Sequence, residues 1–248
     1  MPQTHTDIAC VPTSKRVGAQ VWQVFPAISR RRKVCVGQWL IILNLAGWCP
    51  GAEPVPDAPV QDVLAQLEKN FADVKTLRTD FVQEKHLAIF AQTIYLRGSL
   101  FLQKPDRLAW HMQEPVRYML VLAGQTLRQW DEESNQVQQT PLSANPILQV
   151  VAEQLRRWFG GEYTGLTKLY DVSVAGRSPT SLEFKPRKDS MTATAVKSVR
   201  VTFREDERYL SALTIEEPNG DRTSIVFTNT VMNPVLGESV WEVKPHAK

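Results

Sequence analysis

The chain has 248 residues, of which 43% are hydrophobic, and it carries a formal net charge of +3 and three cysteines. Residues 1–52 hold six of the 29 Lys and Arg residues and one of the 26 Asp and Glu residues, so residues 53–248 keep 23 basic and 25 acidic residues and a net charge of −2. This balance excludes a basic surface for nucleic acid. All three cysteines also lie in residues 1–52, which excludes a thiol nucleophile, a thiolate metal site and a disulfide framework from the remainder.

Residues 1–52 have the pattern of an export leader. A basic block at residues 29–33 precedes a mostly apolar stretch at 34–48, and small residues follow at Gly51-Ala52. This order predicts a secretory signal peptide that is cleaved near residue 52. The basic block begins late, which indicates a translation start downstream of Met1. The alternative is a retained membrane anchor, although about 15 apolar residues are fewer than the roughly 20 that a spanning helix needs.

The first periodic segment follows a proline-rich entry at residues 53–59. Apolar residues recur at steps of three and four from Val60 to Val74, which predicts an amphipathic helix with Asp57 as its N-cap. A second such segment at residues 147–159 predicts another helix, ended by Gly160-Gly161.

Period-two alternation predicts strands over the rest of the chain, and Asn219-Gly220 predicts a hairpin turn. The expected strands are residues 81–87, 94–102, 108–112, 118–122, 127–130, 170–174, 181–185, 199–203, 210–216, 223–228 and 240–243. Few helices separate them, so we expect residues 53–248 to form a single, mainly β domain (α+β): a long, curled antiparallel sheet with two helices applied to it.

The sequence offers little sign of catalysis. It contains no nucleophile elbow, phosphate-binding loop, glycine-rich dinucleotide motif or zinc-protease motif, and His86, His111 and His246 lack ligand spacing. We therefore predict no enzyme, no catalytic residue, no metal site and no cofactor. A hydrolase whose site is assembled from scattered residues is the alternative.

An excess of apolar residues stands out between residues 110 and 130, and the stretch 118–122 is apolar on both faces of its strand. Two explanations remain open. The sheet is covered by one helix on each side, or it curls around an apolar pocket with one helix as a lid.

Residues 98–115 (GSLFLQKPDRLAWHMQEP) resemble the outer-membrane lipoprotein carrier family, LolA, in which a glycine-led strand precedes a basic residue, a proline and then Trp-His-Met. Residues 81–85 and 124–131 resemble neighbouring strands of that family. The resemblance implies an unclosed β-barrel with a helical lid over an apolar cavity. It also implies a monomeric, non-catalytic periplasmic carrier that takes lipoproteins from an inner-membrane ABC transporter of the LolCDE type to an outer-membrane acceptor of the LolB type.

The resemblance also implies roles for particular residues. Lys104 stands where the family has an arginine that is important for onward transfer, and lysine keeps the charge but loses bidentate geometry. The cavity-lining candidates are Leu108, Trp110, Met112, Met119, Leu122 and Trp130. The lid candidates are Ile147, Leu148, Val151, Leu155 and Trp158.

Two further interpretations concern the cargo. Residues 149–170 resemble LolA-like paralogues found beside polyketide, polyene or glycolipid exporters, which suggests a carrier of another lipid with a dedicated exporter. A lipid-sensing regulatory module that shares this fold is the other alternative.

Overall fold

The structure, a computed structural model, describes residues 59–89 and 93–244. Its main feature is a single antiparallel sheet of 11 strands. In chain order these are β1 (Thr76–His86), β2 (Thr93–Gln103), β3 (Arg107–Glu114), β4 (Tyr118–Ala123), β5 (Thr126–Asp131), β6 (Val137–Pro141), β7 (Tyr170–Arg177), β8 (Thr180–Pro186), β9 (Ser198–Phe203), β10 (Leu210–Glu216) and β11 (Arg222–Met232).

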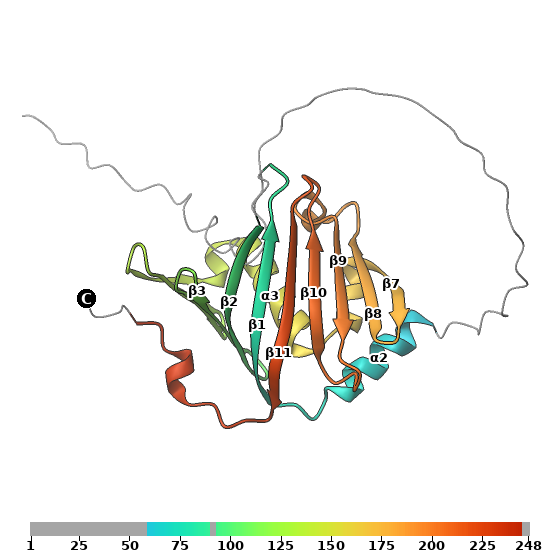
Figure 1. The fold of residues 1–248 in the computed structure, drawn as a ribbon, viewed down its shortest axis with the longest axis horizontal. Helices are drawn as coiled ribbons and strands as arrows, with labels where there is room; N and C mark the ends of the chain where they lie inside the picture. The colour runs from blue at the N-terminus through green and yellow to red at the C-terminus, as the bar shows by residue number, and fades with distance from the viewer. Residues whose placement is uncertain (1–58, 90–92, 245–248) are drawn as a thin grey trace, which may run out of the picture.

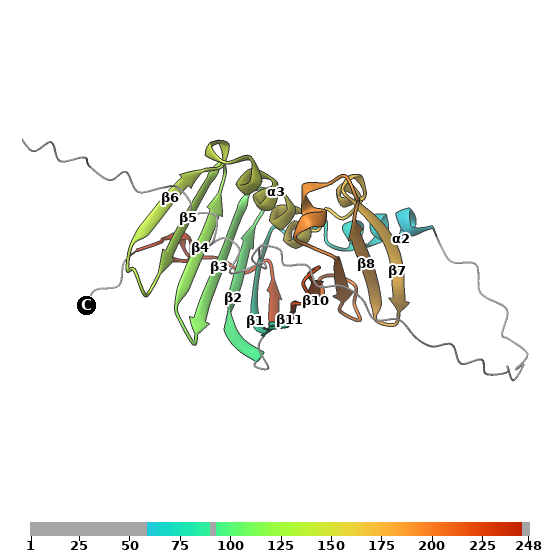
Figure 2. The ribbon, with the colours of Figure 1, turned by 90° about the horizontal axis from the view of Figure 1, so that it is seen from above.

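The sheet consists of two meanders, β1 to β6 and β7 to β11, which are joined where the first strand, β1, pairs with the last, β11. β6 and β7 form the two edges, so the sheet is unclosed. Seen from above, the two meanders curl as arms around a shared concave face (Figure 2). The predicted fold class, a mainly β chain with an unclosed, curled antiparallel sheet and two helices, is confirmed.

Helix α3 (Pro146–Gly160) connects the two edges of the sheet, because it lies between β6 and β7 in the chain. It crosses the concave side, behind the sheet in Figure 1. Helix α2 (Val60–Asn70) lies below the β7–β9 arm in the same view. Four short 3-10 helices complete the described chain: η1 (Leu142–Ala144), η2 (Thr164–Lys168), η3 (Met191–Thr194) and η4 (Glu238–Trp241).

The ends of the two α-helices are fixed by local contacts. α3 ends as the glycine pair predicts: Gly161 has a φ of +77°, and a Cβ atom there would lie 2.4 Å from the ring of Phe71. The start of α2 differs in detail, since Pro59 is its N-cap residue and the expected cap, Asp57, lies outside the described residues. The side chain of Glu68 on α2 accepts hydrogen bonds from the N–H and the hydroxyl of Thr164.

The expected last strand at residues 240–243 is wrong. Residues 240 and 241 end η4 instead, and the segment lies on the outer face of the sheet, where Trp241 packs against Ala109 and Val121. Alternation of apolar residues suggested a strand, but β3 and β4 already use their backbone groups to pair with neighbours. A segment that lies on a sheet face finds no ladder to join.

Strand β6 was missed by the sequence patterns. Its sequence, Val137 to Pro141, is mostly polar, and its burial alternates only between half-buried and exposed. It pairs with β5 alone and forms an edge of the sheet. Short polar edge strands carry almost no hydrophobic signal.

Candidate functional site

The concave face of the sheet is lined by apolar side chains from both arms, and they form one continuous core with the helices. On β3 and β4 the antiparallel register places Leu108 opposite Leu122 and Trp110 opposite Leu120. Four of the six predicted lining residues share this face and are at most 8% exposed: Leu108, Trp110, Met112 and Leu122.

The other two predicted lining residues, Met119 and Trp130, lie on the outer face. They are cross-strand partners of each other, and Met119 is also the partner of His111. Trp130 donates its indole N–H to Asn135, 2.9 Å away, in the turn that follows β5. Because residues 118–122 are apolar at every position, the sequence alone offered no means of deciding which alternate residues face inward.

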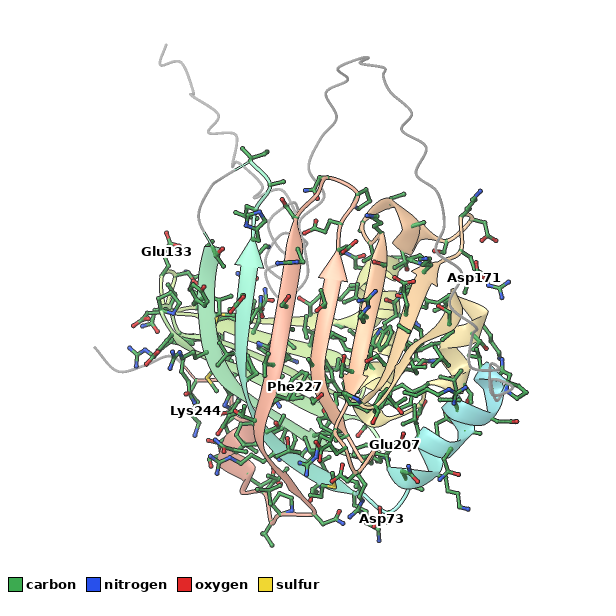
Figure 3. All side chains as sticks on the ribbon, turned by 45° about the vertical axis from the view of Figure 1, so that its right-hand side comes forward. Asp73, Glu133, Asp171, Glu207, Phe227 and Lys244 are labelled. Carbon is green, nitrogen blue, oxygen red and sulfur yellow. The ribbon has the colours of Figure 1, made fainter. Side chains whose placement is uncertain are left out.

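Helix α3 fills the concave side with aromatic rings that contact both arms. Trp158 packs edge-on against Phe184 of β8, with a centroid separation of 4.5 Å. Its neighbour Phe159 contacts Trp110 of β3 at 5.8 Å and Phe227 of β11, labelled in Figure 3, at 6.0 Å. The helix therefore bridges the two arms through its side chains.

Four of the five predicted lid residues are buried in this contact: Leu148, Val151, Leu155 and Trp158. The side chain of Ile147 lies outside the described part of the structure. Phe159, which is completely buried, was missed, although it follows Leu155 by four residues and so continues the same helical stripe.

Lys104 fastens the β2–β3 turn to the end of α2. Its Nζ donates to the backbone carbonyl of Phe71 at 3.2 Å and stands 4.3 Å from the centroid of the same ring. Burial lowers the pKa of Lys104, while the charges of Glu162 and Asp73 oppose this shift. The lysine also borders a small cavity of about 110 Å³, whose wall includes Arg156 and Glu162.

Within residues 59–89 and 93–244, no group of three or more His, Cys, Asp or Glu residues is placed to hold a metal ion. His111 lies on the outer face beside the backbone of Val240. Burial lowers the pKa of His111, and a hydrogen bond with that backbone opposes the shift. The same ranges contain no helix with the length and apolar character needed to cross a membrane.

Comparison with known proteins identifies the family. The model of the family "Outer membrane lipoprotein carrier protein LolA" matches residues 72–244. The chain belongs to the LolA family. Among its relatives, an outer-membrane lipoprotein carrier protein of Aeromonas salmonicida is 22% identical over 210 residues, 83% of this chain and 90% of the relative. A protein of the same description from Albidiferax ferrireducens is 28% identical over 197 residues, 74% of this chain and 87% of the relative.

Solved structures are similar to this chain at low sequence identity. An uncharacterized conserved protein from Thermus thermophilus has a TM-score of 0.48 and 9% identity, covering 74% of this chain and 93% of its own. A LolA superfamily protein from Nitrosomonas europaea has a TM-score of 0.39 and 9% identity, covering 75% of this chain and 99% of its own.

Residues 98–115, which carry the strongest resemblance to the LolA family, form most of the β2–β3 hairpin beside β1. Gly98 is required there, because a Cβ atom would lie 2.0 Å from the carbonyl oxygen of His111. Trp110 packs between Phe81, at 4.2 Å between ring centroids, and Phe159 of α3. The hairpin therefore supplies a central part of the apolar face that α3 covers.

Proposed function

We propose that this chain is a periplasmic carrier that binds the acyl chains of lipoproteins between its concave face and α3, and transfers them from the inner to the outer membrane. Membership of the LolA family supports the carrier role. The observation that carries the proposal furthest is the aromatic contact between α3 and both arms. Trp158 and Phe159 occupy an apolar surface that acyl chains would occupy in their place.

The energetics suit an exchange of this kind. Each methylene group removed from water contributes about 0.8 kcal/mol, so a lipoprotein's acyl chains need a cover while they cross an aqueous space. When α3 moves aside, its rings lose apolar contacts that the acyl chains restore. The free-energy difference between the empty and loaded states then stays small, which permits release.

The attachment of α3 also permits such a movement. Its hydrogen bonds to other elements run through side chains: Gln154 donates to Thr192 and accepts from the hydroxyl of Tyr170 on β7, and Arg157 donates to the carbonyl of Gly165. None of these bonds belongs to the backbone hydrogen-bond ladder of the sheet. The helix can therefore leave the concave face while the strands stay paired.

Lys104 has a separate role in the proposed transfer step. Its single hydrogen bond to Phe71 and its place over that ring tie the β2–β3 turn to the end of α2. We assign Lys104 the role of holding the empty protein closed. The ammonium of Lys104 donates one hydrogen bond to Phe71, whereas a planar guanidinium has several donors in a fixed fork, so closure here depends on fewer hydrogen bonds.

The proposed carrier has a donor at the inner membrane and an acceptor at the outer membrane, and it catalyses no reaction. The carrier receives its cargo as a monomer from an inner-membrane ABC transporter of the LolCDE type and delivers it to an outer-membrane acceptor of the LolB type. It uses no cofactor and makes or breaks no covalent bond. A dedicated exporter with a polyene or glycolipid cargo is the second candidate, supported by the resemblance of residues 149–170 to such paralogues.

A displacement assay tests the carrier role. The purified protein should bind a fluorescent fatty-acid probe stoichiometrically, and a triacylated lipopeptide should displace the probe. Displacement by a glycolipid but not by the lipopeptide would favour the second candidate. Failure of every acylated compound to bind or to displace the probe would overturn the proposed function.

A further inference from the structure

Gln83 is a polar side chain that is completely buried in the apolar concave face. On β1 it follows Leu77 and Phe81 in the inward-facing alternation. Its cross-strand neighbours are Ile225 of β11 and Leu96 of β2. Ile225 belongs to the main core and Leu96 packs against it, so the amide of Gln83 stands in an apolar wall.

Neither the amide nitrogen nor the amide oxygen of Gln83 has a hydrogen-bond partner among the residues that the structure describes. A buried polar group that stays unpaired costs about 1–3 kcal/mol. Gln129 on β5, buried on the same face, provides the contrast. Its amide oxygen accepts from Tyr118 and its nitrogen donates to Gln138.

Polar residues continue from Gln83 toward one end of the concave face. Thr223, 1% exposed, lies on β11 opposite Lys85, the next inward-facing residue of β1. Glu217 follows β10 and is 4% exposed. The lining of the interior therefore changes along β1, from the aromatic Phe81, through an unpaired amide, to groups that carry charge.

We propose that the amide of Gln83 is a subsite for the ester or amide carbonyl that joins an acyl chain to the polar part of the cargo. The subsite rests on the function proposed above, and it specifies the orientation of the acyl chain in the interior. The hydrocarbon lies against Phe81 and Trp110, the linking carbonyl accepts a hydrogen bond from the Gln83 amide nitrogen, and the polar part leaves past Thr223 and Glu217.

Two probes that differ only in this carbonyl test the subsite. 1-Palmitoyl-glycerol has an ester carbonyl, whereas 1-hexadecyl-glycerol has the same head group and chain length with an ether in its place. Wild-type protein should bind the ester about tenfold more tightly, the ratio expected for one hydrogen bond to an otherwise unpaired buried donor. Gln83→Leu should bring this ratio to about one while it leaves the affinity for the ether unchanged or raised.

The thermal stability of the empty protein provides a second measurement, in which Gln83→Leu and its control should have opposite effects on Tm. Gln83→Leu removes an unpaired amide and should raise Tm. The matched control Gln129→Leu breaks two hydrogen bonds on the same face, so it should lower Tm and keep the preference for the ester.

The outcomes separate the subsite from the carrier role. Equal binding of the two probes by wild-type protein would overturn the subsite and leave the carrier role standing, and so would a preference that survives Gln83→Leu. If neither probe binds, the subsite is overturned, and the displacement assay with the lipopeptide decides whether the carrier role fails with it. If Gln83→Leu does not fold, the ester-to-ether ratio of wild-type protein and the carbonyl stretching frequency of a ¹³C-labelled ester decide, because a hydrogen bond lowers that frequency.

Discussion

Glu217 is a carboxyl group held where its charge is poorly solvated. It follows β10 in the turn to β11, and its Oε1 is buried without a partner in the described part of the chain. Burial raises the pKa of Glu217 to about 7, the nearby charge of Asp221 adds to the shift, and Lys85 opposes it. The side chain therefore changes its charge near neutral pH, at the end of the interior where we place the polar part of the cargo.

The raised pKa of Glu217 leads to a prediction about stability and pH. Between pH 4.5 and about 7 the folded protein binds more protons at this residue than the unfolded chain does, so stability falls as pH rises through this window. Glu217→Gln has no charge to bury, and above pH 7 it should be more stable than wild-type protein by on the order of 1 kcal/mol or more, about 2–4 °C in Tm.

Thermal unfolding of both proteins from pH 4 to pH 8 measures this difference. The Tm values of the two proteins should converge toward pH 4. A constant difference in Tm across the range would contradict the assignment of a raised pKa to Glu217. Asp221→Asn, which removes the second cause of the shift, should reduce the dependence on pH without abolishing it.

At the scale of elements, α3 is the part whose movement the carrier role requires. Trp158→Asp places a charge between Phe184 and Tyr170 and should drive the helix from the concave face. We expect weaker retention of a bound lipid probe, while the strand signal in far-UV circular dichroism is unchanged. Gln149→Asp puts the same charge on the exposed side of α3 and should leave retention unchanged.

The opposite result is equally informative. If Trp158→Asp unfolds the sheet along with the helix, α3 is part of the obligatory core and does not act as a lid. Limited proteolysis of the variant, with cleavage confined to residues 142–168, would distinguish local release of the helix from global unfolding.

The sequence patterns predicted the helices and ten of the strands because each of these buries a periodic apolar stripe. They failed for segments whose burial does not follow a periodic apolar pattern. β6 is polar at an edge, and the segment around Trp241 is anchored on a sheet face by one large side chain. The site shows the same limit. Met119 and Trp130 were placed among the lining residues because composition cannot assign a face, and Gln83 stood out only when its missing partners were seen.

At the scale of the whole molecule, the outer face has a core of its own. Trp241 is 2% exposed against Ala109 and Val121, with the guanidinium of Arg107 5.0 Å from its ring centroid. Its carbonyl accepts a hydrogen bond from Arg128. The C-terminal segment thereby braces β3, β4 and β5 from the side opposite α3.

Trp241→Ala should therefore lower the free energy of unfolding by about 3 kcal/mol, because it empties this outer cluster. Affinity for a lipid probe should stay close to that of wild-type protein under conditions where both remain folded. Urea denaturation and probe titration measure the two quantities separately. A large loss of affinity with unchanged stability would show that the outer face takes part in binding.

The pairing of β1 with β11 has a consequence for how the chain is made. Each arm is a set of neighbouring hairpins that can form early, but the seam between the arms joins strands at opposite ends of the described chain, and such distant pairing is slow. Until the last strand has been synthesised, the two halves have no common sheet and the concave face is incomplete. Closure of the concave face therefore waits for β11, however early the hairpins of each arm have formed.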